Sequence, residues 1–226
     1  MLTLALDATT RAGSCAVARN GVVICETASD RAQPPAARLP IEMMSLLDQA
    51  GVSLQDVDIY AVATGPGSFT GLRVGIASMQ GLAFAAGKPL IGVSGLDALA
   101  RIASGESRVA TWVDAWRGEV YAALYEDGRE VGPPIVAEPP YVLGRLRGLR
   151  TLFVGDGAEA SRELIQGTLG GLARFADPMT PLLSGTIARL ATDMARAGHL
   201  PPPNAIAPLY VRRPDAELAR DARAAR

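Results

Sequence analysis

Hydrophobic residues in the first half of the chain occur in short runs separated by turn residues, and then in longer segments with helical spacing. The Asn20-Gly21 pair between two short runs is typical of a β-hairpin. Apolar residues that recur at the period of a helix indicate the longer elements. The pattern predicts strands at 2–6, 14–18, 22–25 and 59–64, and helices at 39–50 and 69–86.

The second half of the chain repeats this arrangement. An apolar run ends at Asp114 as the first run ends at Asp7, and a turn glycine follows each aspartate after 14 positions, at Gly128 and Gly21. Both halves then continue with a helix, a strand and a second helix, which indicates an internal duplication. The pattern predicts strands at 108–113, 120–125, 130–131 and 152–154, and helices at 141–146, 158–166 and 185–197.

The order of these elements predicts the fold class. Strands that alternate with helices after an antiparallel opening favour an α/β fold with two lobes, each a mixed sheet flanked by helices. We expect an N-terminal lobe at 1–102 and a C-terminal lobe at 103–213, joined near 94–107. The last residues, 214–226, are rich in Ala and Arg and are expected to fray.

Composition and charge limit the functions that fit this chain. The 22 Lys and Arg residues are balanced by 23 Asp and Glu residues, and the sequence shows no aromatic–basic patch, so we expect no strong direct binding of tRNA. The first residues lack the basic segment of a signal peptide, and no apolar run approaches the roughly 20 residues of a membrane-spanning helix. We therefore predict a cytoplasmic protein with no membrane partner.

Few residues are available for catalysis. His199 is the only histidine and Lys88 the only lysine. Neither lies in the motif of a zinc site, a serine triad or a Walker phosphate-binding loop. The sequence therefore predicts no catalytic residue and no metal site.

A glycine-rich block, GPGSFTGLR at 65–73, joins a predicted strand to a predicted helix. Its glycines permit a tight turn, and Ser68 can cap the helix. Because the start of such a helix can hold an anion, phosphate binding is the alternative. The glycine spacing differs from the GxGxxG of dinucleotide-binding loops and no acidic residue follows at the right distance, which favours a structural turn.

Five segments together resemble the bacterial TsaB family, also called YeaZ. They are LALDATT at 4–10, the block at 65–73, GVSGL at 92–96, VDAWRGEVY at 113–121 and LYVR at 209–212. The resemblance runs in order from residue 1 to about residue 213, and the block at 65–73 is its most specific part.

The resemblance implies a fold and a role. The fold is the duplicated one of the actin, Hsp70 and sugar-kinase superfamily, which is related to ribonuclease H. The role is in placing the threonylcarbamoyl group on the adenosine next to the anticodon of tRNAs that read ANN codons. In that pathway TsaB is a non-catalytic subunit: it binds its paralogue TsaD, which carries the metal and performs the transfer, and together they engage the ATPase TsaE. In isolation a homodimer is expected.

The first predicted helix agrees with a non-catalytic role. TsaD-type relatives hold their metal with a His-x-x-x-His pair on this helix, and the segment 36–44 of this chain contains no histidine. Many TsaB proteins keep one histidine just before the helix, where this chain has Pro35.

Kinases of the same fold bind phosphates on two hairpin turns and adenosine on a glycine-rich turn. The segment at 7–10 resembles the first turn, but the second, at 114–118, has Trp116 in place of a glycine run. We therefore expect a vestigial cleft with no required cofactor and at most weak binding of ATP or ADP. We favour the interpretation that Asp7 and Asp114, the two aspartates of this cleft, each cap the turn in which they lie. The cleft comprises Asp7, Thr9, Thr10, Asp114, Gly155 and Gly157.

The helices predicted at 39–50 and 69–86 are more apolar than packing on one sheet requires. Gly71, Gly75 and Ser78 form a ridge of small residues that would let another helix approach closely. Packing of the two helices on each other within the chain is the alternative. The predicted partner interface comprises Leu39, Met43, Met44, Leu47, Gly71, Leu72, Gly75, Ser78 and Met79.

Two other functions stay open at this point. One is a small-molecule kinase of the same fold, which would need the second phosphate turn. The other is a homodimeric nucleotide sensor, which would bind ATP tightly without hydrolysing it.

Overall fold

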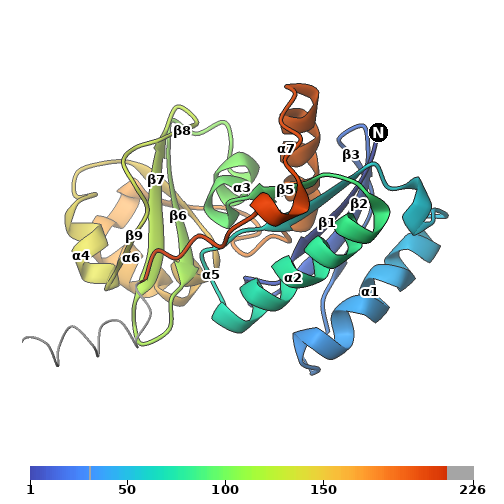
Figure 1. Cartoon of the computed structure of the whole chain (residues 1–226). Helices are drawn as coiled ribbons and strands as arrows, with labels where there is room; N and C mark the ends of the chain where they lie inside the picture. Colours follow the sequence, from blue (N-terminus) through green and yellow to red (C-terminus); the bar gives the residue numbers. More distant parts are fainter. Residues whose placement is uncertain (31, 213–226) are drawn as a thin grey trace, which may run out of the picture.

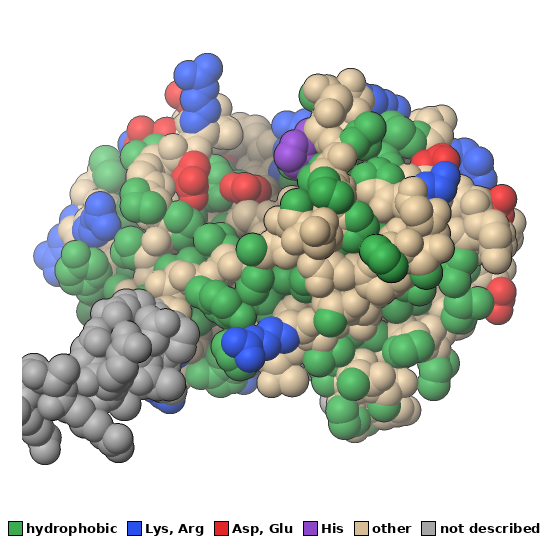
Figure 2. Space-filling model, viewed as in Figure 1, with side chains coloured by type: hydrophobic (Ala, Val, Ile, Leu, Met, Phe, Trp, Pro, Cys, Tyr) green, Lys and Arg blue, Asp and Glu red, His purple; other side chains and the backbone are tan. Residues whose placement is uncertain are grey.

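The computed structural model describes residues 1–30 and 32–212, which form two sheets side by side with helices packed against them (Figure 1). A hollow separates the upper parts of the two lobes in the space-filling view (Figure 2). The tail expected at 214–226 lies outside the described residues. Within the described part of the chain, no helix is both long and apolar enough to cross a membrane.

The first sheet has five strands in the order β3-β2-β1-β4-β5. Strand β1 pairs antiparallel with β2 and parallel with β4, and β2 pairs antiparallel with β3. Hairpins join the antiparallel strands, whereas each parallel neighbour is reached through a helix, as parallel pairing requires. The strands are β1 (Leu2–Asp7), β2 (Ser14–Arg19), β3 (Val22–Ala28), β4 (Ile59–Ala63) and β5 (Leu90–Val93).

The second sheet repeats this topology, so the predicted duplication and the two mixed sheets are confirmed. Read from its β8 edge, its order is β8-β7-β6-β10-β11, and the short strand β9 pairs with β7. The central strand β6 again has an antiparallel neighbour in β7 and a parallel one in β10. The strands are β6 (Arg108–Asp114), β7 (Val120–Glu126), β8 (Arg129–Glu130), β9 (Ile135–Ala137), β10 (Thr151–Val154) and β11 (Ala173–Phe175).

Alternation along β1 distributes its side chains between two cores. Leu4 and Leu6 lie in a hydrophobic cluster with α1 (Pro35–Gln49) and α2 (Phe69–Ala86). Ala5 belongs to a second cluster, which includes residues of α7 (Ser184–Arg196). Figure 1 shows α1 and α2 on one face of the sheet and α7 on the other. Strands β1 and β4 are buried on both faces, and apart from Thr3 and Asp7 of β1 their residues are hydrophobic.

Helix α7 comes from the second half of the sequence but packs on β1, β2 and β4 of the first sheet. The hydroxyl groups of Thr3 and Thr192 are hydrogen bonded at 2.9 Å, and the Ser184 hydroxyl donates to Glu26 at 2.9 Å. The chain therefore crosses from the second sheet back to the first.

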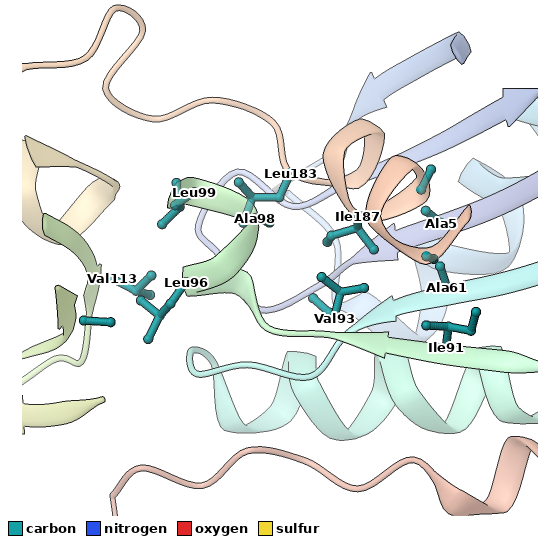
Figure 3. Packing of buried hydrophobic residues seen from close by; sticks show 14 of the residues in the cluster. Ala5, Ala61, Ile91, Val93, Leu96, Ala98, Leu99, Val113, Leu183 and Ile187 are labelled. Carbon is teal, nitrogen blue, oxygen red and sulfur yellow. The ribbon is translucent and has the colours of Figure 1, made fainter. Parts of the chain in front are cut away.

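The expected junction at 94–107 contains a helix, α3 (Gly95–Ile102). Ser94 caps it by accepting a hydrogen bond from the Asp97 amide at 3.4 Å. Its buried residues Leu96 and Leu99 lie between the lobes, near Val113 of β6 and Leu183 before α7 (Figure 3). The junction is therefore a packed part of the core.

The prediction of one helix at 158–166 is wrong in one respect, because two helices meet there at Ser161.

The second lobe has a core of its own, in which Trp112 and Phe153 pack edge to face with ring centroids 5.4 Å apart. Its remaining helices are α4 (Pro139–Gly144), α5 (Asp156–Ala160) and α6 (Arg162–Leu169). Three 3₁₀ turns complete the described elements: η1 (Leu54–Asp56), η2 (Gly170–Leu172) and η3 (Pro203–Ala205).

The final described segment, 203–212, runs along α2 and ties the lobes together; we call it the strap. The Gln80 amide group donates to the carbonyl oxygens of Pro203 at 3.0 Å and Ile206 at 3.3 Å. At its end, the Arg212 guanidinium forms an ion pair with Glu119, which lies in the turn before β7. The strap therefore fixes one edge of α2 against the rest of the molecule.

Candidate functional site

The block at 65–73 is a turn from β4 into α2 that packs on the loop after β1. The Ser68 amide donates to the Thr9 carbonyl oxygen at 2.8 Å, and the Ser68 hydroxyl accepts from the Gly71 amide at 3.2 Å. A Cβ atom on Gly71 would lie 1.9 Å from the Ala8 carbonyl oxygen. Hydrogen bonds and close packing within the chain thus hold this turn, which supports the structural interpretation of the block.

Asp7 is fully buried and caps the turn that follows β1. One of its carboxylate oxygens accepts from the Thr9 amide at 2.8 Å and the Thr9 hydroxyl at 2.7 Å. The Thr10 hydroxyl donates to the other oxygen. The acceptors of Asp7 are therefore engaged inside its own turn.

Asp114 caps the corresponding turn in the second lobe. Its carboxylate accepts from the Trp116 amide at 2.8 Å, and the Arg11 guanidinium lies 3.8 Å from it. Trp116 and Arg117 both have left-handed backbones, with φ of 55° and 58°. A turn of this shape replaces the glycine run of a phosphate loop, and its aspartate caps it.

Gly155 and Gly157 let the start of α5 approach β6. A Cβ atom on Gly155 would lie 2.1 Å from the Trp112 carbonyl oxygen, and one on Gly157 would lie 2.9 Å from the Val113 carbonyl carbon. Both positions require glycine because backbone meets backbone there. Packing within the lobe therefore explains these two residues.

The structure brings Thr10, Asp114 and Gly155 to one cavity of about 230 Å³ between the lobes, whereas Asp7, Thr9 and Gly157 are buried beneath it. Asp156, at the start of α5, accepts hydrogen bonds from the Asp114 amide at 2.9 Å and the Arg11 amide at 3.5 Å. Burial raises the pKa of the Asp156 carboxyl, although these hydrogen bonds oppose the effect. The cavity is lined by Thr10, Arg11, Ala12, Leu99, Val113, Asp114, Gly155, Asp156, Glu159, Ala160, Thr180, Pro181 and Leu183.

The charged residues of the described lining are mainly acidic, because Asp114, Asp156 and Glu159 face the cavity and Arg11 is the one cation among them. Without a counter-ion, such carboxylates repel the like charge of a phosphate. The amides of Thr9 and Trp116, which could bind phosphate, already donate to Asp7 and Asp114. Among residues 1–30 and 32–212, no group of three or more His, Cys, Asp or Glu residues is placed to hold a metal ion.

Most of the predicted interface residues lie inside the first lobe. Leu39, Met43, Leu47, Leu72 and Met79 are buried in the core beneath α1 and α2. Intrachain packing, the alternative weighed from the sequence, accounts for these side chains.

The predicted ridge of small residues is wrong for Gly71 and Gly75. Gly71 faces the Ala8 carbonyl, and a Cβ atom on Gly75 would lie 3.1 Å from the Ala8 Cβ atom and 3.6 Å from Leu6. These glycines let α2 lie close on β1, so their face is covered by the chain itself. Ser78, seven residues after Gly71 on the same ridge, is half-buried.

An apolar groove of about 360 Å³ separates the outer edges of α1 and α2. Met43, Met44 and Ser78 from the predicted set line it, and Ala77 and Gly81 belong to the same open face of α2. Phe84, further along α2, is 81% exposed. Figure 2 shows mainly hydrophobic side chains and backbone over α2, with few charged groups. The groove is lined by Pro40, Met43, Met44, Leu54, Ala77, Ser78, Gly81 and Leu82.

The residues that sequence reasoning missed could have been found from helical geometry. Ala77, Gly81 and Phe84 lie on the side of α2 opposite the buried Leu72 and Met79. A helical-wheel projection of α2 that first located its buried residues would have identified these three on the opposite side.

Comparison with known proteins decides the family. A model of the TsaD family, described as tRNA N6-adenosine threonylcarbamoyltransferase, matches residues 32–220. The tRNA threonylcarbamoyladenosine biosynthesis protein TsaB of Haemophilus influenzae is 32% identical over 185 residues, which cover 74% of this chain and 77% of that protein. The chain belongs to the TsaB family. The solved structure of YeaZ from Pseudomonas aeruginosa is similar with a TM-score of 0.75 and 31% identity, over 92% of this chain and 99% of that chain.

More distant structures show the fold of this TsaB-family chain. The activator of 2-hydroxyisocaproyl-CoA dehydratase from Clostridium difficile has a TM-score of 0.57 at 11% identity, over 92% of this chain and 99% of that chain. The actin-like fold that the resemblance implied is confirmed.

Proposed function

We propose that this chain acts in the biosynthesis of threonylcarbamoyladenosine in tRNA as a non-catalytic scaffold. It binds a TsaD-type paralogue, which performs the transfer, and with that paralogue it engages a TsaE-type ATPase. It acts in the cytoplasm. The observation that carries the proposal is the apolar groove between α1 and α2, because an exposed surface of this kind marks a site of protein association.

The groove has the properties of a helix-binding surface. Its small residues Ala77, Ser78 and Gly81 leave room for another backbone, and Met44 has a flexible side chain that can repack on a partner. Arg73 is the only charged residue of α2, so a partner helix on this face would bury little charge. Each Å² of apolar surface removed from water contributes about 25 cal/mol. Two helices from a paralogue of the same fold could cover the face, and a second copy would cover it in the isolated protein.

The inter-lobe cleft supports a role without catalysis. Its two aspartates cap their own turns, and three carboxylates face the cavity. No cofactor is required by this arrangement, and any binding of ATP or ADP would be weak. The observations on the cleft therefore favour neither a small-molecule kinase nor a nucleotide sensor.

Reconstitution tests the proposal. The full chain should neither hydrolyse ATP nor transfer threonylcarbamoyl to tRNA alone, and it should be required when TsaD- and TsaE-type proteins of the same organism carry out the transfer. Formation of the modified nucleoside is followed by nuclease digestion and mass spectrometry. Omitting this chain should abolish the product.

The cleft provides the control. An Asp7→Ala variant that retains its fold should behave like the wild type in the absence of the partners. Steady ATP turnover by the wild-type chain that Asp7→Ala abolishes would contradict the scaffold role. Full transfer by the partners without this chain would contradict it as well.

A further inference from the structure

Phe69, Arg73 and Tyr210 form a stack of flat side chains at the start of α2, where the strap crosses it. The Arg73 guanidinium carbon lies 3.9 Å from the centre of the Phe69 ring, and Arg73 Nε donates to the Tyr210 hydroxyl at 3.0 Å. The Phe69 and Tyr210 rings are 5.9 Å apart, with an angle of 33° between their planes. We call these three residues the aromatic–arginine stack.

Both rings are partly open to solvent. Phe69 is 50% exposed and Tyr210 is 42% exposed, and Arg73 between them is also exposed. The strap holds Tyr210 in place, because the neighbouring Leu209 amide donates to the Thr64 carbonyl oxygen at 2.8 Å. The stack is therefore held in position by the strap, and part of each ring faces solvent.

Among the described residues, no carboxylate pairs with Arg73. Its contacts there are with the Phe69 ring and with the ring and hydroxyl of Tyr210. Arg11, Arg38 and Arg212 each lie within ion-pair distance of an acidic residue. Among these arginines only Arg73 is positioned by aromatic groups alone.

This combination fits a nucleotide unit of a single strand. Bases that are not stacked in a duplex bind to exposed aromatic rings and to guanidinium planes, and an adjacent arginine can bind a phosphate. Bases within a duplex cannot reach a flat platform, so double-stranded RNA does not fit. The single arginine of the stack suits one phosphate contact, which agrees with a chain whose formal net charge is −1.

We propose that the aromatic–arginine stack binds one unpaired nucleotide of an RNA, with the base on the rings and a phosphate at Arg73. The site lies at the strap edge of α2, whereas the groove lies at its α1 edge. Its binding of RNA goes beyond the scaffold role and does not depend on it. A single stacked nucleotide gives low affinity, consistent with the expectation that the isolated chain does not bind tRNA strongly.

Fluorescence anisotropy of a labelled RNA tests the site in the full-length chain. The probe is a stem-loop with an unpaired loop, and the same strand annealed to its complement serves as the duplex. The wild type should bind the stem-loop and prefer it to the duplex. Removing a stacked aromatic costs about 1–3 kcal/mol, so Phe69→Ala should weaken binding roughly 5- to 150-fold. Arg73→Gln should weaken binding too and reduce the dependence on salt by about one phosphate contact.

Matched variants separate this site from the groove. Phe84→Ala removes a more exposed phenylalanine from the other end of the same helix, and it should leave the RNA affinity unchanged. Phe69→Tyr keeps a flat ring and should retain binding. Melting curves identify any variant that has lost its fold.

Three results would overturn the proposal. They are equal affinity for stem-loop and duplex, no binding of the stem-loop by the wild type at about 1 mM protein, and unchanged RNA affinity in folded Phe69→Ala. If Phe69→Ala with unchanged RNA affinity also loses TsaD binding, the stack is a protein contact. A scaffold role that fails in reconstitution would leave the RNA measurements unaffected, so the two proposals fail separately.

Discussion

Gly71 of α2 faces the backbone of Ala8, and a side chain at position 71 would collide with the Ala8 carbonyl oxygen at 1.9 Å. This contact sets how closely α2 lies on β1 and fixes the start of the helix beside the capped turn at Asp7. The block at 65–73 is thus explained by packing between two pieces of backbone. Packing of this kind leaves little freedom for substitution.

The first prediction concerns this contact. Gly71→Ala should lower the free energy of unfolding by at least about 3 kcal/mol, because neither backbone segment can move aside. Gly81→Ala, on the open face of the same helix, should instead stabilise the protein by up to about 1 kcal/mol through helix propensity. Urea denaturation of the two variants measures both effects. Equal stability of Gly71→Ala and the wild type would contradict the packing account.

The second prediction follows from the buried carboxyl of Asp156, whose pKa is raised by burial. The folded protein keeps a proton on this group at pH values where the unfolded chain has lost it. The contribution to stability is therefore fully present below the ordinary pKa of 3.8 and is lost as the pH rises through the raised pKa. Asp156→Asn removes this titration, so its stability relative to the wild type should rise as the pH increases above 3.8.

Denaturant titrations of both proteins at several pH values test the sign. Asparagine has one acceptor oxygen, whereas two backbone amides donate to Asp156. We therefore also expect a difference in the free energy of unfolding between Asp156→Asn and the wild type that does not change with pH. A stability difference that falls as the pH rises would show that Asp156 is favoured in its charged form.

The third prediction concerns the strap. Gln80→Ala removes both hydrogen bonds to the strap and should cost about 1–2 kcal/mol in total. The Leu209 amide should then exchange faster with deuterium, because its bond to Thr64 depends on a docked strap. Gln49→Ala, which removes an exposed contact to Ser45 in α1, is the control and should leave this amide unchanged. Unaltered exchange in Gln80→Ala would show that the strap is held by other contacts.

Short-range patterns in the sequence were sufficient to predict much of the fold. The range 69–86 of α2 matches the prediction, because Ser68 caps its start and Gly87 ends it in a left-handed conformation. The duplication was visible in the spacing of its two turns. By contrast, β9 and β11 have three residues each, too short to show an alternating pattern, and their pairing with other strands defines them.

The candidate site was predicted less well, for a physical reason. Turn capping by Asp7 and Asp114 depends on neighbours in sequence, and it was anticipated. The exposed face of α2 depends on where the helix meets β1, which the sequence of the helix alone does not define. Arg73 and Tyr210 are 137 positions apart, so their contact could not be inferred from local patterns.

We propose that the open face of α1 and α2 binds a TsaD-type partner. The chain offers a matched pair of substitutions on one helix. Gly81 has no atom within 4 Å of an added Cβ, so Gly81→Arg should fold and place its charge in water. Gly75 faces Ala8 and Leu6, so Gly75→Arg should fail to fold, contrary to the expectation that this glycine faces a partner.

The most direct measurement is the dissociation constant of Gly81→Arg for the TsaD-type paralogue of the same organism, by calorimetry, beside its melting temperature. Burying an unpaired charge in a packed contact costs several kcal/mol, so we expect binding to weaken by about 100-fold or more at an unchanged melting temperature. Homodimers should be lost in size-exclusion chromatography of the same variant. Wild-type affinity of folded Gly81→Arg for the paralogue would contradict the account.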